Sequence, residues 1–441
     1  MHAPNRCSPA GRLGLLAAVV FCSAPLAHTQ PSPAPLSSEQ KKAVLEKVIE
    51  EISAEYVHKE AADKIERHLR EQIARDAYKP VNDEESFAKM LTGELRRIGN
   101  DEHLEVVVHR PEPPANPPRD PNAWIDELRL RNFDFGRLAT LSGNVRYLEL
   151  HSFPPPEVAG ETAAASMRFL AGADAVIIDV RRNGGGTGEM AAFLATYFFE
   201  QRTALVRTFR RVENSTTEDR TLAHVPGPKM PTADLFILTS ASTFSAAEAF
   251  AFSLQQLKRA TVVGEKTRGG ANAGRYRPAT DRFRVFVPIA HATSAATGKT
   301  WDKIGIEPDI KVEAGAALNV AHREALSRLA QKASGAGRKK ELEWMIEVVR
   351  AKEEPKPRRD LRMLTGRYGP HMIALEGEQL LHSQDAGPRW PLVEVANETF
   401  VIDSLRKPVR ITFGGKGPEQ RIDLEYSDGR KVEFKKESGI P

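Results

Sequence analysis

The segment Ala175-Val-Ile-Ile-Asp-Val-Arg-Arg-Asn-Gly-Gly-Gly186 gives the clearest structural signal in the chain. It starts as a continuous apolar run, which is typical of a strand covered on both faces of a sheet. Three consecutive glycines follow, and they allow the backbone to turn sharply and to approach a ligand closely. A helical pattern then continues through Phe199. A buried strand, a glycine turn and a helix in this order predict an α/β layer with a covered sheet.

The alternation of apolar strands and helices extends on both sides of this segment. Apolar runs predict further buried strands at 145–150, 235–238 and 261–263. Helical patterns predict helices at 161–170, 245–257, 318–333 and 339–351. We therefore expect an α/β core over residues 125–353.

Two regions of different character flank this core. Residues 30–110 contain helical patterns and then a short strand at 104–108, which predicts an N-terminal helical subdomain. A proline-rich linker or loop follows at 111–124. After the core, strand-like runs are separated by turn signals such as Asp428-Gly429. Residues 360–441 are therefore expected to form a small antiparallel β domain.

The first 29 residues have the pattern of an export signal. Arg6 and Arg12 provide a positive start, and an apolar run from Leu13 to Leu26 follows. Small residues then precede Gln30, as in a cleavage site, and the run is too short and too broken for a good membrane span. We therefore expect an exported protein, periplasmic or extracellular, with an uncleaved anchor as the alternative.

The composition excludes several kinds of chemistry. Cys7 and Cys22 both lie within the predicted signal, so the mature chain would contain no cysteine. Disulfides, a thiol nucleophile and a cysteine-ligated zinc are then ruled out, which leaves serine, histidine, carboxylates and lysine. No pair of histidines has the spacing of a metal motif, so we expect no metal and no cofactor. The net charge of +4 over 441 residues gives no case for a nucleic-acid partner.

Ser245 is the first candidate for a catalytic group. It follows a predicted buried strand and stands where the next helix begins, in Thr239-Ser-Ala-Ser-Thr-Phe-Ser-Ala-Ala-Glu248. There its hydroxyl would lie beside helix N–H groups, whose dipoles can stabilise a developing oxyanion. The same position suits an ordinary helix N-cap, which on spacing alone is the commoner role. A generic esterase would need a Gly-x-Ser-x-Gly turn, which this segment lacks.

The glycine turn that ends at Gly186 would be a second source of N–H groups in a hydrolase. A phosphate-binding loop is the alternative, but the Gly-Lys-Ser/Thr ending of such loops is missing. His103 lies between a helix end and a strand, so it is expected near a surface or a cleft. A single histidine is usually structural or solvated, and its residue type assigns no role.

Together, these segments resemble the C-terminal processing (tail-specific) serine peptidases, in the branch of the tricorn core protease and the interphotoreceptor retinoid-binding protein repeats. The matching segments occur in the family's order over residues 38–335. They are 95–104, 179–186, 239–248, 262–270 and 301–309. A single one of them is a weak signal, but five in this order are specific.

The resemblance implies an α/β fold with a crotonase-like ββα-layer core, and an exported serine-type peptidase that acts on peptides or unfolded proteins. It makes Ser245 the nucleophile and His103 the general base. It makes Asp302 the acidic member, at a position where the branch usually has Glu. The oxyanion hole would be formed by backbone N–H groups, those of Gly185 or Gly186 and of Ala246.

The departures from the family's pattern also carry information. The lysine of the Ser–Lys branch would stand at Gly270, and Lys266 occupies a different position, so the histidine mechanism is favoured. Glu102 stands where the tricorn-like branch has a serine beside its histidine. The insert at 111–124 is too short for the peptide-binding PDZ domain of the processing branch, and no oligomeric state is indicated. A non-catalytic protein that binds a peptide or an apolar ligand on the same fold is the alternative function.

Overall fold

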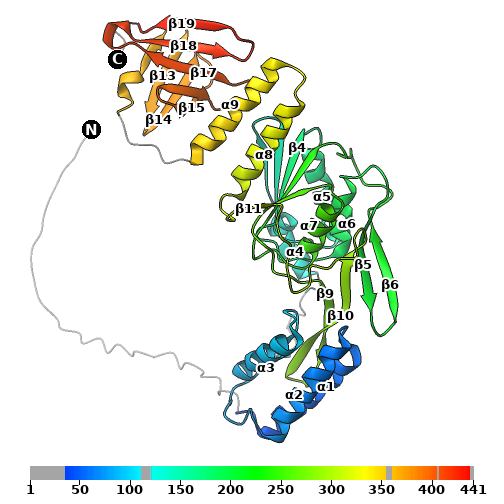
Figure 1. The fold of residues 1–441 in the computed structure, drawn as a ribbon. Coiled ribbons are helices and arrows are strands. Elements are labelled where there is room, and N and C mark those ends of the chain that lie inside the picture. Colours follow the sequence, from blue (N-terminus) through cyan, green and yellow to red (C-terminus); the bar gives the residue numbers. More distant parts are fainter. Residues whose placement is uncertain (1–34, 111–119, 121, 354–359, 405–406, 438–441) are drawn as a thin grey trace, which may run out of the picture.

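The α/β core is present in the computed structural model, which describes residues 35–110, 120, 122–353, 360–404 and 407–437 (Figure 1). Its central sheet has the strand order β11-β8-β7-β4-β3-β2. β2 and β3 are antiparallel, and the other neighbours run parallel. The strands are β2 (Phe135–Leu141), β3 (Val145–Leu150), β4 (Ala175–Asp179), β7 (Asp234–Thr239), β8 (Thr261–Gly264) and β11 (Ile310–Lys311). The predicted export signal at 1–29 lies outside the described residues, as does most of the proline-rich segment.

Helices cover both faces of this sheet because its central strands are apolar at almost every position. Val176 and Ile178 of β4 pack with one set of helices, whereas Ala175 and Ile177 pack with the other. The first set is α5 (Pro156–Leu170), α6 (Gly188–Thr196) and α7 (Ala246–Gln256), and the second is α8 (Ala317–Lys332) and α9 (Ala336–Glu353). The predicted covered sheet is therefore confirmed.

The N-terminal region is helical, as predicted. It contains α1 (Ser38–Glu55), α2 (Lys59–Ala74) and α3 (Glu84–Gly99), followed by β1 (Glu105–Val108). The short helix α4 (Ala123–Leu130) leads into the core, and short 3-10 turns lie at Asn132–Asp134, Arg362–Leu364 and Gly417–Glu419. Over the described part of the chain, no helix combines the length and apolar character that crossing a membrane requires.

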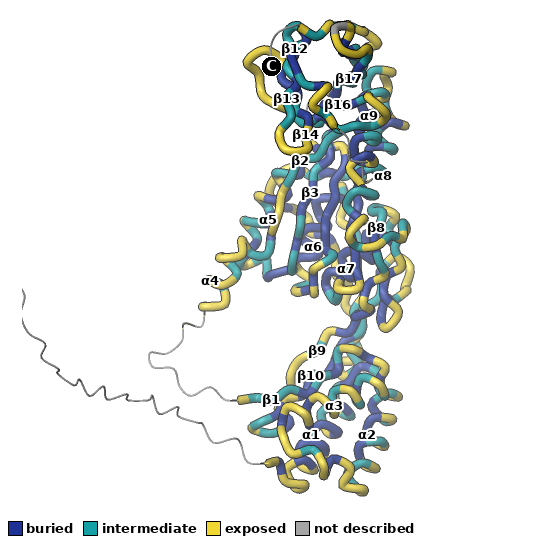
Figure 2. The backbone as a smooth tube through the Cα atoms, turned by 90° about the vertical axis from the view of Figure 1, so that its left-hand side faces the viewer, coloured by how far each residue is buried: buried dark blue, intermediate teal, exposed yellow. Residues whose placement is uncertain are grey.

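A second sheet joins the helical region to the core, and the sequence analysis did not predict its main strands. Its order is β1-β10-β5-β6, with β9 also paired to β10. The added strands are β5 (Ala204–Arg210), β6 (Ser215–Arg220), β9 (Asn272–Pro278) and β10 (Phe283–Ser294). The first half of β10 packs among the N-terminal helices through Val285 and Val287, and its second half pairs with β5. Figure 2 shows β9 and β10 at the junction of the two parts.

The C-terminal antiparallel β region is also confirmed. Each strand from β12 to β19 pairs with the next one along the chain. The strands are β12 (Gly366–Tyr368), β13 (His371–Glu376), β14 (Gln379–Gln384), β15 (Trp390–Ala396), β16 (Thr399–Ile402), β17 (Val409–Gly414), β18 (Arg421–Tyr426) and β19 (Lys431–Lys435). Trp344 and Val348 of α9 pack on Val401, so α9 connects this sheet to the core.

Candidate active site

Ser245 lies in the turn between β7 and α7, as its place in the sequence predicts. Its backbone has φ 54° and ψ −122°, a conformation that costs a non-glycine residue about 1–3 kcal/mol. Hydrogen bonds hold the turn on both sides. The Ser245 N–H donates to Glu248 Oε2 at 2.9 Å, and the Phe244 N–H donates to the Asn183 carbonyl at 3.1 Å. Ser245 is the N-cap of α7 and forms a capping box with Glu248, but its backbone departs from the extended conformation of an ordinary N-cap.

Glu248 ties the serine turn to the glycine loop that follows β8. Its carboxylate is fully buried and accepts the N–H groups of Gly269 at 2.7 Å and Gly270 at 2.8 Å. The hydroxyl of Thr267 donates to the same carboxylate. Burial raises the pKa of Glu248, and these hydrogen bonds act in the opposite direction. The backbone of Ser245 is therefore held by the buried Glu248 carboxylate, which also accepts hydrogen bonds from Thr267, Gly269 and Gly270.

The glycine turn after β4 lies directly against the serine turn. Gly185 has φ 112°, and a methyl group on it would lie 2.8 Å from Ser245 Cβ, so glycine is required there. The Gly185 N–H already donates to Asn183 Oδ1 at 2.9 Å. Within the described ranges, no hydrogen bond uses the N–H of Gly186 or of Ala246. Those two groups are therefore the expected oxyanion donors that are available to a ligand.

His103 comes from the N-terminal helical region, just after the left-handed residue Asn100 ends α3. Its ring packs on Phe244, the residue before Ser245, with 4.8 Å between the ring centroids. Nδ1 of His103 lies 3.0 Å from Asp101 Oδ1. Because an ionised carboxylate can only accept, Nδ1 carries the proton and Nε2 keeps its lone pair. This is the tautomer that a general base requires.

Asp101 is the acidic group that contacts His103. It is 2% exposed, and its Oδ2 accepts the Tyr56 hydroxyl at 3.0 Å and the Asn272 amide at 2.8 Å. Burial by itself would raise the pKa of Asp101, but the hydrogen bonds and charge of His103 and the amide of Asn272 bring this pKa to about 2. Asp101 is therefore ionised at neutral pH and stabilises a positively charged His103.

Asp302, the acidic residue implied by the resemblance, lies one link further along the same network. Its Oδ2 is 3.2 Å from Nδ2 of Asn272, and its Oδ1 accepts the Ala271 N–H at 3.2 Å. Asn272 thus stands between Asp302 and Asp101. Burial and the charge of Asp101 raise the pKa of Asp302. Among the described residues, hydrogen bonds thus link Asp302 to His103 through Asn272 and Asp101.

Sequence reasoning missed Asp101 and Asn272. Asp101 did have a local signal, because an aspartate two residues before a histidine can accept that residue's N–H, and the distance here is 3.0 Å. Asn272 had none, since its contact with Asp101 joins positions 171 residues apart. Glu102, the noted departure, is 53% exposed and lies near Arg96 outside the buried network.

The structure also gives a reason for glycine at position 270. A methyl group there would lie 2.2 Å from the Phe244 ring and 2.8 Å from Cε1 of His103. The space that a lysine side chain would need is therefore filled by the histidine and its aromatic neighbour. Lys266 instead pairs with Glu307 at 2.8 Å and is half exposed.

A cavity of 160 Å³ opens beside Ser245. Small and apolar residues of α6, α7 and β5 form most of its wall, including Ala191, Ala195, Leu205, Val206 and Phe250. Asp219 also contributes to the lining, and burial raises the pKa of this carboxyl. Because the rest of its wall is mostly small and apolar, the cavity suits one apolar side chain of a bound ligand.

Two family models match parts of this chain. Residues 144–312 match the model of peptidase family S41, and residues 36–129 match the N-terminal domain of peptidase S41 in eukaryotic IRBP. The chain is 23% identical over 224 residues to the chloroplastic C-terminal processing peptidase of Tetradesmus obliquus, which covers 48% of this chain and 47% of that protein. It is 31% identical over 172 residues to the carboxyl-terminal-processing protease of Synechocystis sp. (strain ATCC 27184 / PCC 6803 / Kazusa), or 38% of each chain.

The chain thus spans less than half the length of either of these two relatives. Among solved structures, the photosystem II D1 C-terminal processing protease matches with a TM-score of 0.41 and 16% identity. That match covers 63% of this chain and 94% of the other.

Proposed function

This chain belongs to peptidase family S41, and on that premise we propose that it is a serine peptidase that forms an acyl-enzyme on Ser245 with His103 as the general base. The observation that carries the proposal is the strained backbone of Ser245 beside an oriented histidine. Strain of this kind persists only where the surroundings impose it, and it is concentrated at active sites. Peptides or unfolded proteins are the proposed substrates.

The proposed reaction is an acyl transfer in two halves. His103 Nε2 takes the proton of the Ser245 hydroxyl as Oγ attacks the carbonyl carbon of the substrate. The N–H groups of Gly186 and Ala246 hold the negative oxygen that forms. His103 then gives its proton to the leaving amine, and water releases the acyl group by the reverse steps.

Asp101 is the proposed partner of the histidine in this reaction. It fixes the Nδ1–H tautomer and stabilises the imidazolium that forms on proton transfer. Asp302, which the resemblance placed in this role, is a positioning residue that acts on Asp101 through Asn272.

The cavity beside Ser245 supports a preference for substrates with one apolar side chain next to the bond that is cleaved. Its alanine-rich wall leaves room for such a side chain, whereas a charged one would lose most of its hydration there and would meet one acidic lining residue, Asp219. Hydrolysis rates of matched peptides with leucine or lysine at that position test this preference.

The decisive experiment is labelling with a fluorophosphonate probe, which reacts with activated serines. The wild-type chain is expected to react, and the Ser245→Ala and His103→Ala variants are expected not to. Ser242→Ala is a matched control, because Ser242 is an exposed serine in the same loop. Equal labelling of the wild type and both active-site variants would rule out the proposed nucleophile and base.

A binding protein without catalysis is the second candidate. It is favoured by the match of residues 36–129 to the IRBP-type domain and by the apolar cavity. In that case the folded wild type would not react with the probe and would still bind an apolar fluorophore in competition with peptides.

We also propose that the protein is exported and acts in the periplasm or outside the cell. The support is the charged start, apolar run and small residues of positions 1–29. Cell fractionation, with N-terminal sequencing of the mature chain, tests this: the expected N-terminus lies near Gln30.

A further inference from the structure

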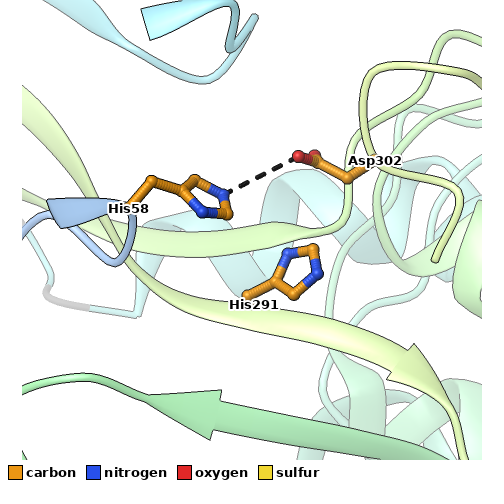
Figure 3. A group of neighbouring side chains, drawn as sticks. All are labelled: His58, His291 and Asp302. Carbon is orange, nitrogen blue, oxygen red and sulfur yellow. Dashed lines mark ion pairs between the residues drawn. The ribbon is translucent and has the colours of Figure 1, made fainter. Parts of the chain in front are cut away.

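Two histidines and an aspartate from separate segments converge around Asn272. His58 precedes α2, His291 lies on β10, and Asp302 lies in the loop between β10 and β11. One ring nitrogen of each histidine and one oxygen of Asp302 all lie within 4.8 Å of one another. Figure 3 shows the three side chains around a common space, and His58 Nε2 is 3.8 Å from Asp302 Oδ2.

The hydrogen bonds of Asn272 determine which atoms carry lone pairs. Its amide nitrogen must face Asp101 and Asp302, since only the nitrogen can donate to carboxylates. Its oxygen then accepts from Nδ1 of His291 at 2.8 Å, which leaves a lone pair on Nε2 of His291. Nε2 of His58 lies 3.3 Å from the same amide nitrogen, so it also presents a lone pair.

The amide nitrogen of Asn272 has more acceptors than hydrogens. Asp101 Oδ2, Asp302 Oδ2 and His58 Nε2 all lie within 3.3 Å of a nitrogen that carries two hydrogens. The shortest of these contacts goes to Asp101, so Asp302 and His58 compete for the remaining hydrogen. Either the buried Asp302 or the partly exposed His58 is then left without this donor, which is unfavourable and would be relieved by a cation.

We propose that His58, His291 and Asp302 bind one divalent transition-metal ion of the Zn²⁺ class. Two imidazoles and a carboxylate are the donors of three-residue zinc and non-haem iron sites. Ligand atoms about 2.0–2.2 Å from a zinc ion lie at most about 4.4 Å apart. The pair at 3.8 Å already meets this limit. One ring nitrogen of His291 lies within 4.8 Å of both other ligand atoms, so a small adjustment of that ring would complete the site through Nε2.

The surroundings favour a bound cation. Burial is the largest influence on the pKa of His58 and of His291 and lowers both, whereas the charge of Asp101 and, for His291, that of Asp302 act in the opposite direction. The lowered pKa favours the unprotonated ring that a metal ion requires. The carboxylates of Asp101 and Asp302 both contact Asn272, so acidic groups lie on this side of the site. The side chain of His58 is 29% exposed, which gives an ion a route from solvent.

A metal ion at this site would have a structural role, which the proposed peptidase chemistry does not require. It would link the start of α2 in the N-terminal helical region to the loop that carries Asp302 in the core. Its His291 ligand also donates to Asn272, in the way that a metal-bound histidine commonly uses its second nitrogen.

The test is a Zn²⁺ titration of the folded, metal-free chain by calorimetry, with Co²⁺ as a spectroscopic reporter. The wild type is expected to bind one Zn²⁺ ion per chain and to melt at a higher temperature when Zn²⁺ is present. Bound Co²⁺ is expected to show the visible absorption of a site with low coordination number. His58→Gln and His291→Gln are expected to lose all three responses while keeping the wild-type circular dichroism without metal.

His68→Gln is the matched control, because His68 lies on α2 and pairs with Glu94 at 2.8 Å in a second histidine–carboxylate contact. This variant is expected to bind Zn²⁺ like the wild type. Asp302→Asn gives a further check, with a loss of affinity expected, should a histidine variant fold poorly. No saturable binding by the wild type, or equal binding by the wild type and the site variants, would overturn the proposal.

Discussion

The nucleophile and the base of the proposed site are held in place by different means. Ser245 is positioned by backbone geometry: its own positive φ, the glycine that packs against it, and a buried carboxylate that accepts backbone N–H groups. His103 is positioned by side chains, through Asp101 and the groups that donate to Asp101. A substitution that adds volume should therefore disturb the position of Ser245 more than that of His103. A substitution that removes a charge or a side-chain hydrogen bond should disturb His103 more than Ser245.

The largest effect is expected from Asp101→Asn. Asparagine keeps the shape of the side chain, but its amide can favour the wrong tautomer of His103, and the charge that stabilises the imidazolium is lost. We expect kcat to fall about 10⁴-fold, as tautomer loss does in serine proteases. Steady-state kinetics measure this fall, and a melting curve shows whether the fold is kept. A loss of less than tenfold would contradict the assignment of Asp101.

Glu248→Gln tests the backbone hydrogen bonds that hold the Ser245 turn. Its effect, on the free energy of unfolding, is expected to be the second largest. The new amide can no longer accept from all the donors now facing the carboxylate, so N–H groups such as those of Gly269 and Gly270 are stranded. Each stranded buried donor costs roughly 1–3 kcal/mol, so the free energy of unfolding should fall by about 3 kcal/mol. Urea unfolding measures this change.

Glu265→Gln is the matched control for that experiment. The Glu265 carboxylate also accepts two backbone N–H groups, those of Ala241 and Ala314, but it lies nearer the surface where water can replace the lost bonds. Little change in stability is expected. A fall as large as that of Glu248→Gln would show that burial is not what makes Glu248 important.

Gly270→Ala adds a methyl group between the serine turn and His103. The methyl group would press on Phe244 and His103, and such overpacking typically costs about 1–3 kcal/mol. We expect a lower melting temperature together with reduced probe labelling, because the histidine is displaced from the serine. Gly160→Ala on α5 is the control, since a methyl group there meets no atom within 4 Å. Unchanged labelling of Gly270→Ala would show that the contact is easily relieved.

The smallest effect is expected from Asp302→Asn. Asparagine can still accept the Ala271 N–H, and the change reaches His103 only through Asn272 and Asp101. We expect kcat to fall by about tenfold or less, equivalent to about 1.4 kcal/mol. If Asp302→Asn proved more damaging than Asp101→Asn, Asp302 would be the third catalytic member that the family resemblance implied.

The sequence predicted what local pattern controls. The strand at 145–150 has the predicted bounds, and the helix after Ser245 begins one residue later than expected, because apolar runs and turns are local signals. Strands β9 and β10 were missed, since charged residues such as Arg275, Arg277 and Arg284 hide their alternation. Asn272 lies at the start of β9, so the link between the two carboxylates was missed for the same reason.

Strand β10 has a consequence for the folding chain. Its first half is buried among the N-terminal helices and its second half is paired with the core. His103 therefore packs on Phe244, the residue before the serine, only after both halves have docked. With the proposed chemistry, a chain whose core has folded ahead of its helices holds a nucleophile without a base. With that chemistry, such a chain would be latent until the two regions have assembled.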